Sequence, residues 1–283
     1  MIRNYYLGCP GWGLKSWVGR LFPPGTRSTE FLERYAEVFN TVEGNTTFYA
    51  LPTPEMIERW AAQVPDHFRF CFKFPRTLTH DRMLDLPHGD AELAEFLARV
   101  TPLEHKLGQL FLQLPPAFGP AHLDRLRALF DQLPRAFHYA VEVRHEAFFD
   151  FARAALDDVL ASHQADVVIL DTRGIHASRS LEHAETRARK PNLPVMPRAT
   201  AAHPFIRCVP HETFAESRAI VEGWSAQVAT WIRGGKTPYF FMHAPDDTFA
   251  PENAYDFHAM LRARVDVGEL PKRPGAPRQQ SLF

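Results

Sequence analysis

The sequence has almost no net charge and few cysteines. Its 32 Lys and Arg residues against 33 Asp and Glu residues leave a formal net charge of -1. A chain this close to neutrality has no overall attraction to polyanions, so any nucleic-acid binding depends on a local basic patch. The three cysteines, Cys9, Cys71 and Cys208, lack the spacing of a zinc motif or a disulfide framework. We expect reduced thiols in a cytoplasmic protein.

Long apolar runs and glycine-rich nucleotide-binding motifs are also absent. No apolar run reaches the length of a membrane span, and the opening residues, MIRNYYLGCPGW, lack the charged and apolar regions of a signal peptide. No glycine-rich phosphate-binding loop follows a predicted strand, which disfavours the open-sheet nucleotide-binding folds. Hydrophobic residues make up 45% of the 283 residues, so the chain can bury a large core. We expect a globular protein with no membrane segment.

Eight short β-like runs alternate with helix-like stretches from one end of the chain to the other. Apolar residues recur at helical spacing between the runs, as in residues 123–133. Eight β-then-α units in this length predict an α/β fold, a single (β/α)8 TIM-type barrel over residues 1–267, rather than an open doubly wound sheet. The predicted strands are residues 5–9, 41–46, 68–74, 109–114, 139–144, 167–171, 205–209 and 238–243.

Two segments fall outside this alternating pattern. Residues 172–200 form a long, polar, net basic stretch after the sixth strand, on the face where barrel loops carry chemistry. A flexible lid and an inert surface excursion are both consistent with this stretch. Residues 268–283 are rich in turn-forming Pro and Gly, and we expect them to leave the barrel as a flexible tail.

Polar side chains are predicted to form a ring inside one end of the barrel. Alternate residues of a barrel strand point inward to the axis or outward to the helices. In residues 68–74, four phenylalanines occupy one face and leave Arg69, Cys71 and Lys73 on the other. Inward residues at the C-terminal strand ends face the loops where barrel enzymes place catalytic groups. By this rule the ring contains Glu43, Asn45, Lys73, Gln113, Glu142, Arg144, Asp171, Arg207 and His243.

The charges of this ring favour an anionic ligand. Arg grips phosphate or carboxylate through paired hydrogen bonds, and Lys acts as a point charge. A neighbouring carboxylate serves as a general base or binds a hydroxyl group. We therefore predict a phosphate- or carboxylate-bearing ligand, with buried ion pairs that only neutralise one another as the alternative. The ring combines the acids Glu43, Glu142 and Asp171 with the cations Lys73, Arg144 and Arg207.

Aromatic residues and histidines add further candidates. Trp12 and Tyr49, in the loops after the first two strands, are candidates for stacking on a base or sugar, although packing of the loops onto the barrel rim is the favoured explanation. His80 and His145 are candidates for acid–base chemistry or metal binding, with a structural hydrogen-bonding role as the alternative. A divalent metal held by the acids with His80 or His243 has no support from ligand spacing, and no cofactor is identified.

Several motifs resemble one protein family. GCPGW, YAEVFNTVEGNTTFYALP, FKF with LTH, GQLFLQLPPAF and VEVRH follow one another in the order and spacing of the YecE-like proteins, known as domain of unknown function 72. The resemblance covers roughly residues 5–265. It implies a TIM-type barrel but no reaction, because the family is biochemically uncharacterised. The matched positions are Gly11, Trp12, Trp17, Glu43, Asn45, Thr47, Phe48, Tyr49, Trp60, Lys73, His80, Gln113, Pro115, Glu142, Arg144 and Arg207.

The chain departs from the family pattern at two places. After the seventh strand the family usually has Arg-x-His-Gly, where this sequence has Pro210 and His211. After the eighth strand the family usually has two asparagines, where this sequence has Met242 and His243. Both departures lie on one side of the predicted pocket and point to a shifted substrate or a reduced activity.

The last five residues, QQSLF, resemble the short peptide by which many bacterial DNA-processing proteins bind the replication sliding clamp. In that peptide Leu282 and Phe283 would fill an apolar cleft of the partner, and Gln279 would fix the register. An uninformative or self-docking terminus is the alternative.

Three functions are consistent with the sequence. The first is an enzyme such as a hydrolase or phosphodiesterase that acts in DNA metabolism and is recruited by the tail, with Glu43 or Glu142 as general base and Lys73 among the anion-binding groups. The second is a non-catalytic ligand-binding or adaptor protein. The third is an isomerase or aldolase of small phosphorylated sugars, which gives the tail no role. Fold alone cannot choose among them, because this barrel hosts many chemistries.

Overall fold

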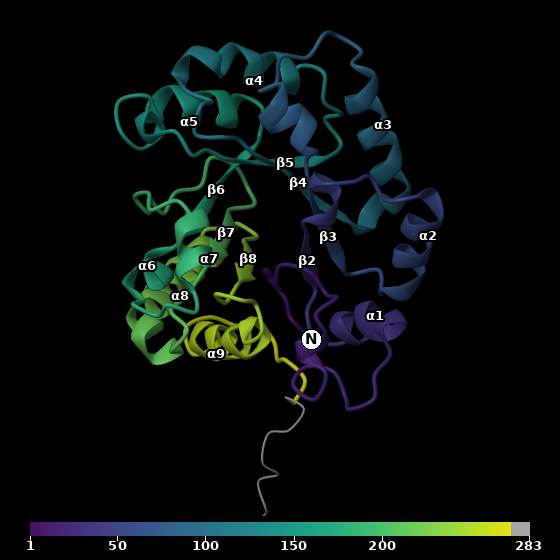
Figure 1. The fold of residues 1–283 in the computed structure, drawn as a ribbon, viewed down its shortest axis with the longest axis vertical. Helices are drawn as coiled ribbons and strands as arrows, with labels where there is room; N and C mark the ends of the chain where they lie inside the picture. Colours follow the sequence, from purple (N-terminus) through teal and green to yellow (C-terminus); the bar gives the residue numbers. More distant parts are fainter. Residues whose placement is uncertain (273–283) are drawn as a thin grey trace, which may run out of the picture.

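The computed structural model, which describes residues 1–272, is a ring of strands surrounded by helices (Figure 1). Eight parallel strands make one nearly closed barrel in this part of the chain, in the order β1-β8-β7-β6-β5-β4-β3-β2. The (β/α)8 prediction is confirmed, and no predicted strand boundary is wrong by more than two residues. The strands are β1 (Tyr6–Gly8), β2 (Thr41–Gly44), β3 (Arg69–Lys73), β4 (Leu107–Gln113), β5 (His138–Glu142), β6 (Asp166–Asp171), β7 (Phe205–Cys208) and β8 (Tyr239–Met242).

The helices pack around the outside of the strands (Figure 1). Their starts follow local signals: α2 begins with Pro54 at its first position, and the Thr53 hydroxyl oxygen caps it by accepting from the Met56 amide. The described helices are α1 (Phe31–Ala36), α2 (Pro54–Gln63), α3 (Ala91–Val100), α4 (Leu123–Phe130), α5 (Arg153–Ser162), α6 (Arg173–Ala177), α7 (Ala184–Arg189), α8 (Arg218–Arg233) and α9 (Ala250–Arg262).

The core has two layers, as the alternation in residues 68–74 predicts. Outward-pointing Phe70 and Phe72 stack against Trp60 of α2, so these rings belong to the layer between strands and helices. A second, smaller cluster fills the barrel itself. That interior cluster contains Cys71, Phe111, Ala140, Val168, Phe205, Tyr239 and Phe241.

The barrel closes between β1 and β2 largely through side chains. No regular ladder joins these two strands in residues 1–272, although the Glu43 amide donates to the Cys9 carbonyl. The Tyr35 hydroxyl accepts from the Cys9 amide at 2.7 Å and donates to the Thr41 carbonyl at 2.9 Å. The strands approach closely at Gly8, where a Cβ atom would lie 2.2 Å from the Thr41 carbonyl oxygen. We call this junction the β1–β2 seam.

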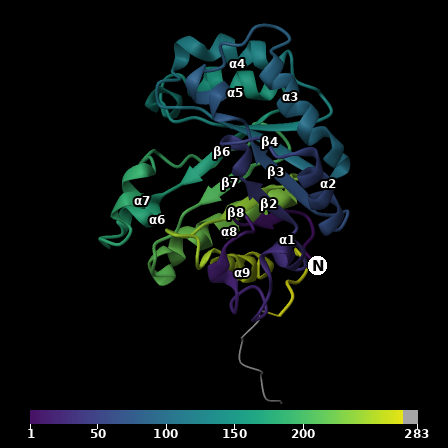
Figure 2. The same cartoon turned by 45° about the vertical axis from the view of Figure 1, so that its right-hand side comes forward.

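The segment after β6 forms a wall of the barrel mouth. Figure 2 shows α6 and α7, which belong to it, beyond the end of β6. β5 and β6 pair at only two positions, Ala140 with Asp166 and Val141 with Val167, so their C-terminal halves have no ladder. Residues 190–200 lie over this gap, and the Thr172 hydroxyl ties the segment to β6 by donating to the Pro191 carbonyl at 2.7 Å.

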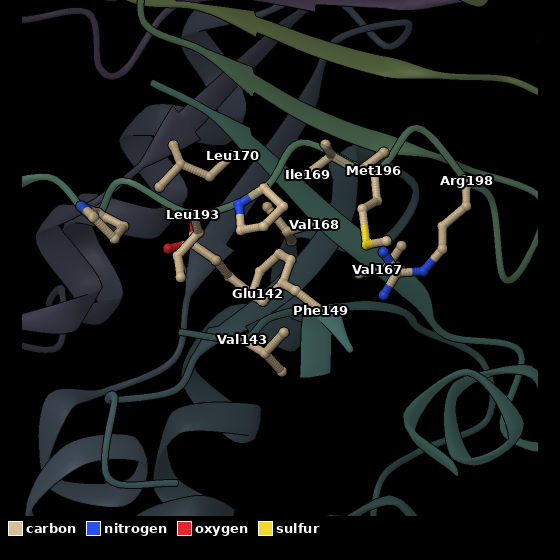
Figure 3. A pocket seen from close by; sticks show the side chains of 12 residues that line it. Glu142, Val143, Phe149, Val167, Val168, Ile169, Leu170, Leu193, Met196 and Arg198 are labelled. Carbon is tan, nitrogen blue, oxygen red and sulfur yellow. The ribbon is translucent and has the colours of Figure 1, made fainter. Parts of the chain in front are cut away.

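Apolar side chains fix residues 190–200 in place. Leu193 and Met196 share a small cavity with Val143 and Phe149, as Figure 3 shows. Arg198 pairs with Asp157 of α5 at 2.9 Å. These contacts place residues 190–200, which are half-buried or exposed, against β5, β6 and α5, so this part of residues 172–200 packs on the barrel.

The described chain ends beside its own beginning. Gly268 bridges to Ile2, and Leu270 packs against the edge of the main core, so the first residues of the predicted tail still contact the barrel. The predicted clamp-binding residues Gln279, Leu282 and Phe283 lie outside the described residues. Within residues 1–272, no helix is long and apolar enough to cross a membrane.

Candidate functional site

A polar cavity of about 470 Å3 opens at the C-terminal ends of the strands. Six cationic side chains line it against a single carboxylate, Asp247. Six residues of the predicted ring line the cavity: Asn45, Lys73, Gln113, Arg144, Arg207 and His243. Its remaining lining residues are Pro10, Phe48, Tyr49, Arg76, His80, Thr186, Arg189 and Lys190.

Two buried carboxylates lie on either side of Arg207 below this cavity. The Arg207 guanidinium binds Glu43 through two hydrogen bonds of 2.9 and 2.7 Å, and its Nη1 donates to Glu142. Arg144 holds the other oxygen of Glu142 from Nε at 2.8 Å and Nη2 at 2.7 Å. All three members of the Glu43–Arg207–Glu142 group are nearly inaccessible to solvent. This buried network orients the groups at the cavity floor.

Glu43 has two further partners. The Asn45 amide donates to its Oε1 at 2.7 Å, and His243 Nε2 lies 3.2 Å from its Oε2. Burial alone would raise the pKa of Glu43, but Arg207 and His243 outweigh it and hold the pKa well below its ordinary value. Glu43 is therefore an ionised anchor for the network at neutral pH.

Glu142 is also firmly ionised. Burial raises its pKa, but Arg144, Arg207 and Lys73 together lower the pKa to about 2. A general base works best when its pKa lies near the operating pH. The expected role of Glu142 as general base is therefore disfavoured by its surroundings.

Lys73 is a cavity residue whose pKa lies near neutrality. Its Nζ donates to Gln113 Oε1 at 2.9 Å and lies 3.6 Å from the centre of the Phe48 ring. Only 7% of the residue is exposed. Burial, reinforced by Arg207, lowers the pKa of Lys73 to about 7 although Glu142 and Glu43 act in the opposite direction. Lys73 can therefore give up or accept a proton near pH 7.

His80 contributes a neutral imidazole to the cavity. Burial and then Lys73 and Arg144 lower the pKa of His80 to about 4. The Thr79 hydroxyl donates to the Pro75 carbonyl, so in its 3.0 Å contact with His80 Nδ1 it accepts the hydrogen bond. The proton of His80 therefore resides on Nδ1, and Nε2 keeps its lone pair.

The wall after β6 adds cations that we did not name from the sequence. Arg189 at the end of α7 and the following Lys190 both line the cavity. Burial, reinforced by Arg207, lowers the pKa of Lys190. The net basic character of residues 172–200 was the available signal, but the sequence could not show which of its cations turn towards the barrel axis.

Two predicted site residues lie elsewhere. Asp171 does not point inward: it accepts from Trp224 Nε1 of α8 at 2.7 Å and aligns with outward-facing Cys208 of β7. Trp12 packs edge-on against Trp60 with ring centres 5.1 Å apart, as part of the outer layer, and is not among the residues that line the cavity. The inward placement of Asp171 was wrong, whereas Trp12 packs on the barrel rim, which was the favoured explanation for its loop.

Aromatic residues at the mouth come from the loop after β2 instead. Tyr49 lines the cavity and is 80% exposed, while Phe48 is buried against it with ring centres 5.1 Å apart. Among residues 1–272, no cluster of three or more His, Cys, Asp or Glu side chains is arranged to hold a metal ion.

Comparison with known proteins places the chain in a family. The model for "Protein of unknown function DUF72" matches residues 6–280. UPF0759 protein YecE of Escherichia coli K12 is 42% identical over 285 residues, covering 98% of this chain and 99% of that protein. UPF0759 protein YunF of Bacillus subtilis is 31% identical over 117 residues, or 40% of each chain.

Solved structures share the fold. The crystal structure of a DUF72 family protein from Thermotoga maritima matches with a TM-score of 0.72 and 23% identity, covering 91% of this chain and 99% of that one. A DUF72 family protein from Enterococcus faecalis matches with a TM-score of 0.70 and 18% identity, covering 91% and 97%. The match to the family model over almost the whole length and the identity to YecE together show that this chain belongs to the DUF72 family.

Proposed function

We propose that the protein is an enzyme that binds a small phosphate- or carboxylate-bearing substrate in the mouth cavity and uses Lys73 for proton transfer. The observation that carries this proposal is uncompensated positive charge. Arg144 and Arg207 pair with carboxylates of the network, but neither Lys73 nor Lys190 has a carboxylate within 4.0 Å among the described residues. A partly dehydrated cation without a counter-charge is costly, and an anionic ligand would supply the missing partner.

The protonation states support Lys73 rather than the carboxylates as the reacting group. With a pKa of about 7, Lys73 exchanges a proton readily at neutral pH, whereas Glu142 with a pKa of about 2 is a weak base. Perturbed titratable groups in a cavity are frequent at catalytic sites. A non-catalytic ligand-binding barrel would need the cations but would not need an amine in this state.

The first test measures anion binding. Titration of the full chain with inorganic phosphate, followed by calorimetry, should give saturable binding at pH 7. Lys190→Gln should weaken binding about tenfold, since a charge-assisted hydrogen bond contributes about 1.5–3 kcal/mol.

The matched control for this test is Arg59→Gln, which removes one exposed cation from α2 on the outside of the barrel. Arg59→Gln should leave phosphate affinity unchanged. Equal weakening in both variants would mean that phosphate responds only to overall charge, and the mouth cavity would lose its assignment.

The tail favours a second candidate function. We propose, as the alternative, that the substrate is a nucleic-acid phosphodiester and that QQSLF recruits the protein to a DNA sliding clamp. The support is the match of Gln279, Ser281, Leu282 and Phe283 to the clamp-binding pattern, together with the cations of the mouth, which suit a phosphodiester as well as a small phosphate.

A further inference from the structure

We propose that Lys73 is a nucleophile that forms an imine with the aldehyde or ketone group of a phosphate-bearing substrate. This inference rests on the proposed binding of anions in the mouth cavity, and it adds a substrate class and a covalent step. Its basis is the position of one amine relative to the rings, amides and cations around it.

Within residues 1–272, no carboxylate lies within 4.0 Å of the Lys73 amine. The amine contacts the amide oxygen of Gln113 and the face of Phe48, and neither is a base that would keep it permanently protonated. The Phe48 ring favours the ammonium form, but burial and the nearby Arg207 favour the neutral amine more strongly. An amine that is desolvated beside another cation is the form in which lysine attacks carbonyl groups.

The backbone places this amine rigidly. Lys73 is the last residue of β3, and its carbonyl accepts from the Thr47 hydroxyl at 2.6 Å. That bond ties the strand end to the loop that carries Phe48, so the ring and the amine are positioned by the same contact. A nucleophile at the end of a barrel strand faces the loops that surround the substrate.

Cations on the wall of the same cavity are suited to the phosphate. Arg144 follows β5, two strands from β3, and Arg189 and Lys190 follow β6, three strands from β3, so these three side chains reach the mouth from a different part of the barrel than Lys73. A phosphate held by this wall would present a carbonyl group on the same molecule towards Lys73. Binding energy from the phosphate would then orient the reacting carbon.

The covalent step conserves atoms and electrons. The Lys73 nitrogen lone pair forms a bond to the carbonyl carbon as the C=O π bond breaks; the nitrogen loses one N–H proton and the oxygen takes one up, which gives a carbinolamine. The nitrogen then forms the C=N bond as the C–O bond breaks, and the hydroxyl group takes up the second N–H proton and leaves as water. No oxidant or reductant is needed. The two protons that the nitrogen loses are the two that the oxygen gains. His80, whose ring packs against the same Phe48 with ring centres 5.1 Å apart, lines the cavity beside the reacting amine.

Pyridoxal 5′-phosphate tests the proposal because it carries both an aldehyde and a phosphate. The full chain is incubated with it at pH 7, the imine is reduced with borohydride, and the modified peptides are identified by mass spectrometry. Lys73 should be labelled at least tenfold faster than Lys272, an exposed lysine of the same chain. Pyridoxal, which has the aldehyde without the phosphate, should label Lys73 at least tenfold more slowly than the phosphorylated probe.

Three results would overturn the imine. In the first, Lys73 is labelled no faster than Lys272. In the second, Lys190 is labelled in preference to Lys73. In the third, pyridoxal and pyridoxal 5′-phosphate label Lys73 at equal rates. Comparing lysines within the unaltered chain makes the outcome independent of whether any variant folds. Lys73→Arg, which keeps the charge without the nucleophile, should lose the label and retain phosphate binding. If phosphate still binds but Lys73 is not labelled, the imine proposal is wrong and the proposed anion site stands. If phosphate does not bind and Lys73 is not labelled, both proposals are wrong.

Discussion

Lys73 carries a proton more weakly in the folded protein than in the unfolded chain, where its pKa is about 10.4. Because its folded pKa is about 7, the unfolded chain binds one more proton than the folded chain between pH 7 and 10. The free energy of unfolding therefore rises with pH across that window, and the full penalty is present below pH 7. The proposed nucleophile thus destabilises the fold that holds it.

Replacement of this amine should stabilise the protein. We predict that Lys73→Met raises the free energy of unfolding by about 1–2 kcal/mol at pH 6, with a smaller gain at pH 9, as urea denaturation at the two pH values will measure. Lys15→Met, at an exposed position, should change stability by less than about 0.5 kcal/mol at either pH. A gain that does not change with pH would point to better packing instead of removal of a buried charge.

The direction of most side chains in the ring could be predicted from the sequence. The prediction failed in β6, where polar and apolar residues do not alternate. In β3, phenylalanines alternate with polar residues, so Lys73 was assigned to the interior correctly. The run VVILD of β6 is apolar at four successive positions, so nothing in it distinguishes the two faces. The polarity of Asp171 suggested the interior, but a hydrogen bond to Trp224 satisfies it on the helix side.

The Tyr35 hydroxyl replaces part of a strand ladder at the β1–β2 seam. Tyr35→Phe leaves the ring in the core but removes the partner of the Cys9 amide and the Thr41 carbonyl. We predict a loss of about 1–3 kcal/mol in the free energy of unfolding, because buried polar groups are left unpaired. Faster hydrogen exchange at the Cys9 amide should accompany it.

Tyr49→Phe provides the control for the seam, since Tyr49 is 80% exposed and its hydroxyl has no comparable role in the described structure. It should leave stability unchanged within about 0.5 kcal/mol. If the two tyrosine variants are equally stable, water or backbone movement satisfies the seam without the hydroxyl, and its proposed structural role is wrong.

The helices and strands could be predicted from the sequence, but the packing of residues 190–200 on the barrel could not. Strands and helices carry periodic patterns, and all eight strands were found by them. Residues 190–200 contain three prolines, which lack an amide donor, so side-chain packing rather than a ladder holds the segment on β5 and β6. Such packing has no period, and this is why Arg189 and Lys190 were not predicted to reach the cavity.

At the scale of the whole molecule, the eight β–α units of the sequence predicted the barrel. The barrel fold in turn indicated that the site would lie at the C-terminal ends of the strands. Parallel strands bring all their C-terminal ends to one mouth, so residues as distant as Glu43 and Arg207 were expected in a single site and do form an ion pair. The sequence could not show which acid pairs with which cation, because the predicted ring places several cations near each acid.

Recruitment by the tail is also a question about the whole molecule. We predict that purified sliding clamp binds the full chain and fails to bind a chain that ends at residue 278, with surface plasmon resonance as the measurement. Gln280→Ala changes the variable position of the pattern and should retain binding. Equal binding by the full and shortened chains would remove the tail from any account of the function.

The order of the strands has a consequence for synthesis. β1 forms its ladder with β8, and Tyr6 is aligned with Tyr239 across it. At translation rates of about 5–20 residues per second, roughly 10–50 s pass between the synthesis of β1 and that of its partner β8. During that time the β1–β2 seam is already available to Leu7 and Cys9. The Tyr35 hydroxyl and the Asn40 amide, which contact β1 from residues made early, would thus act as its first partners in the growing chain.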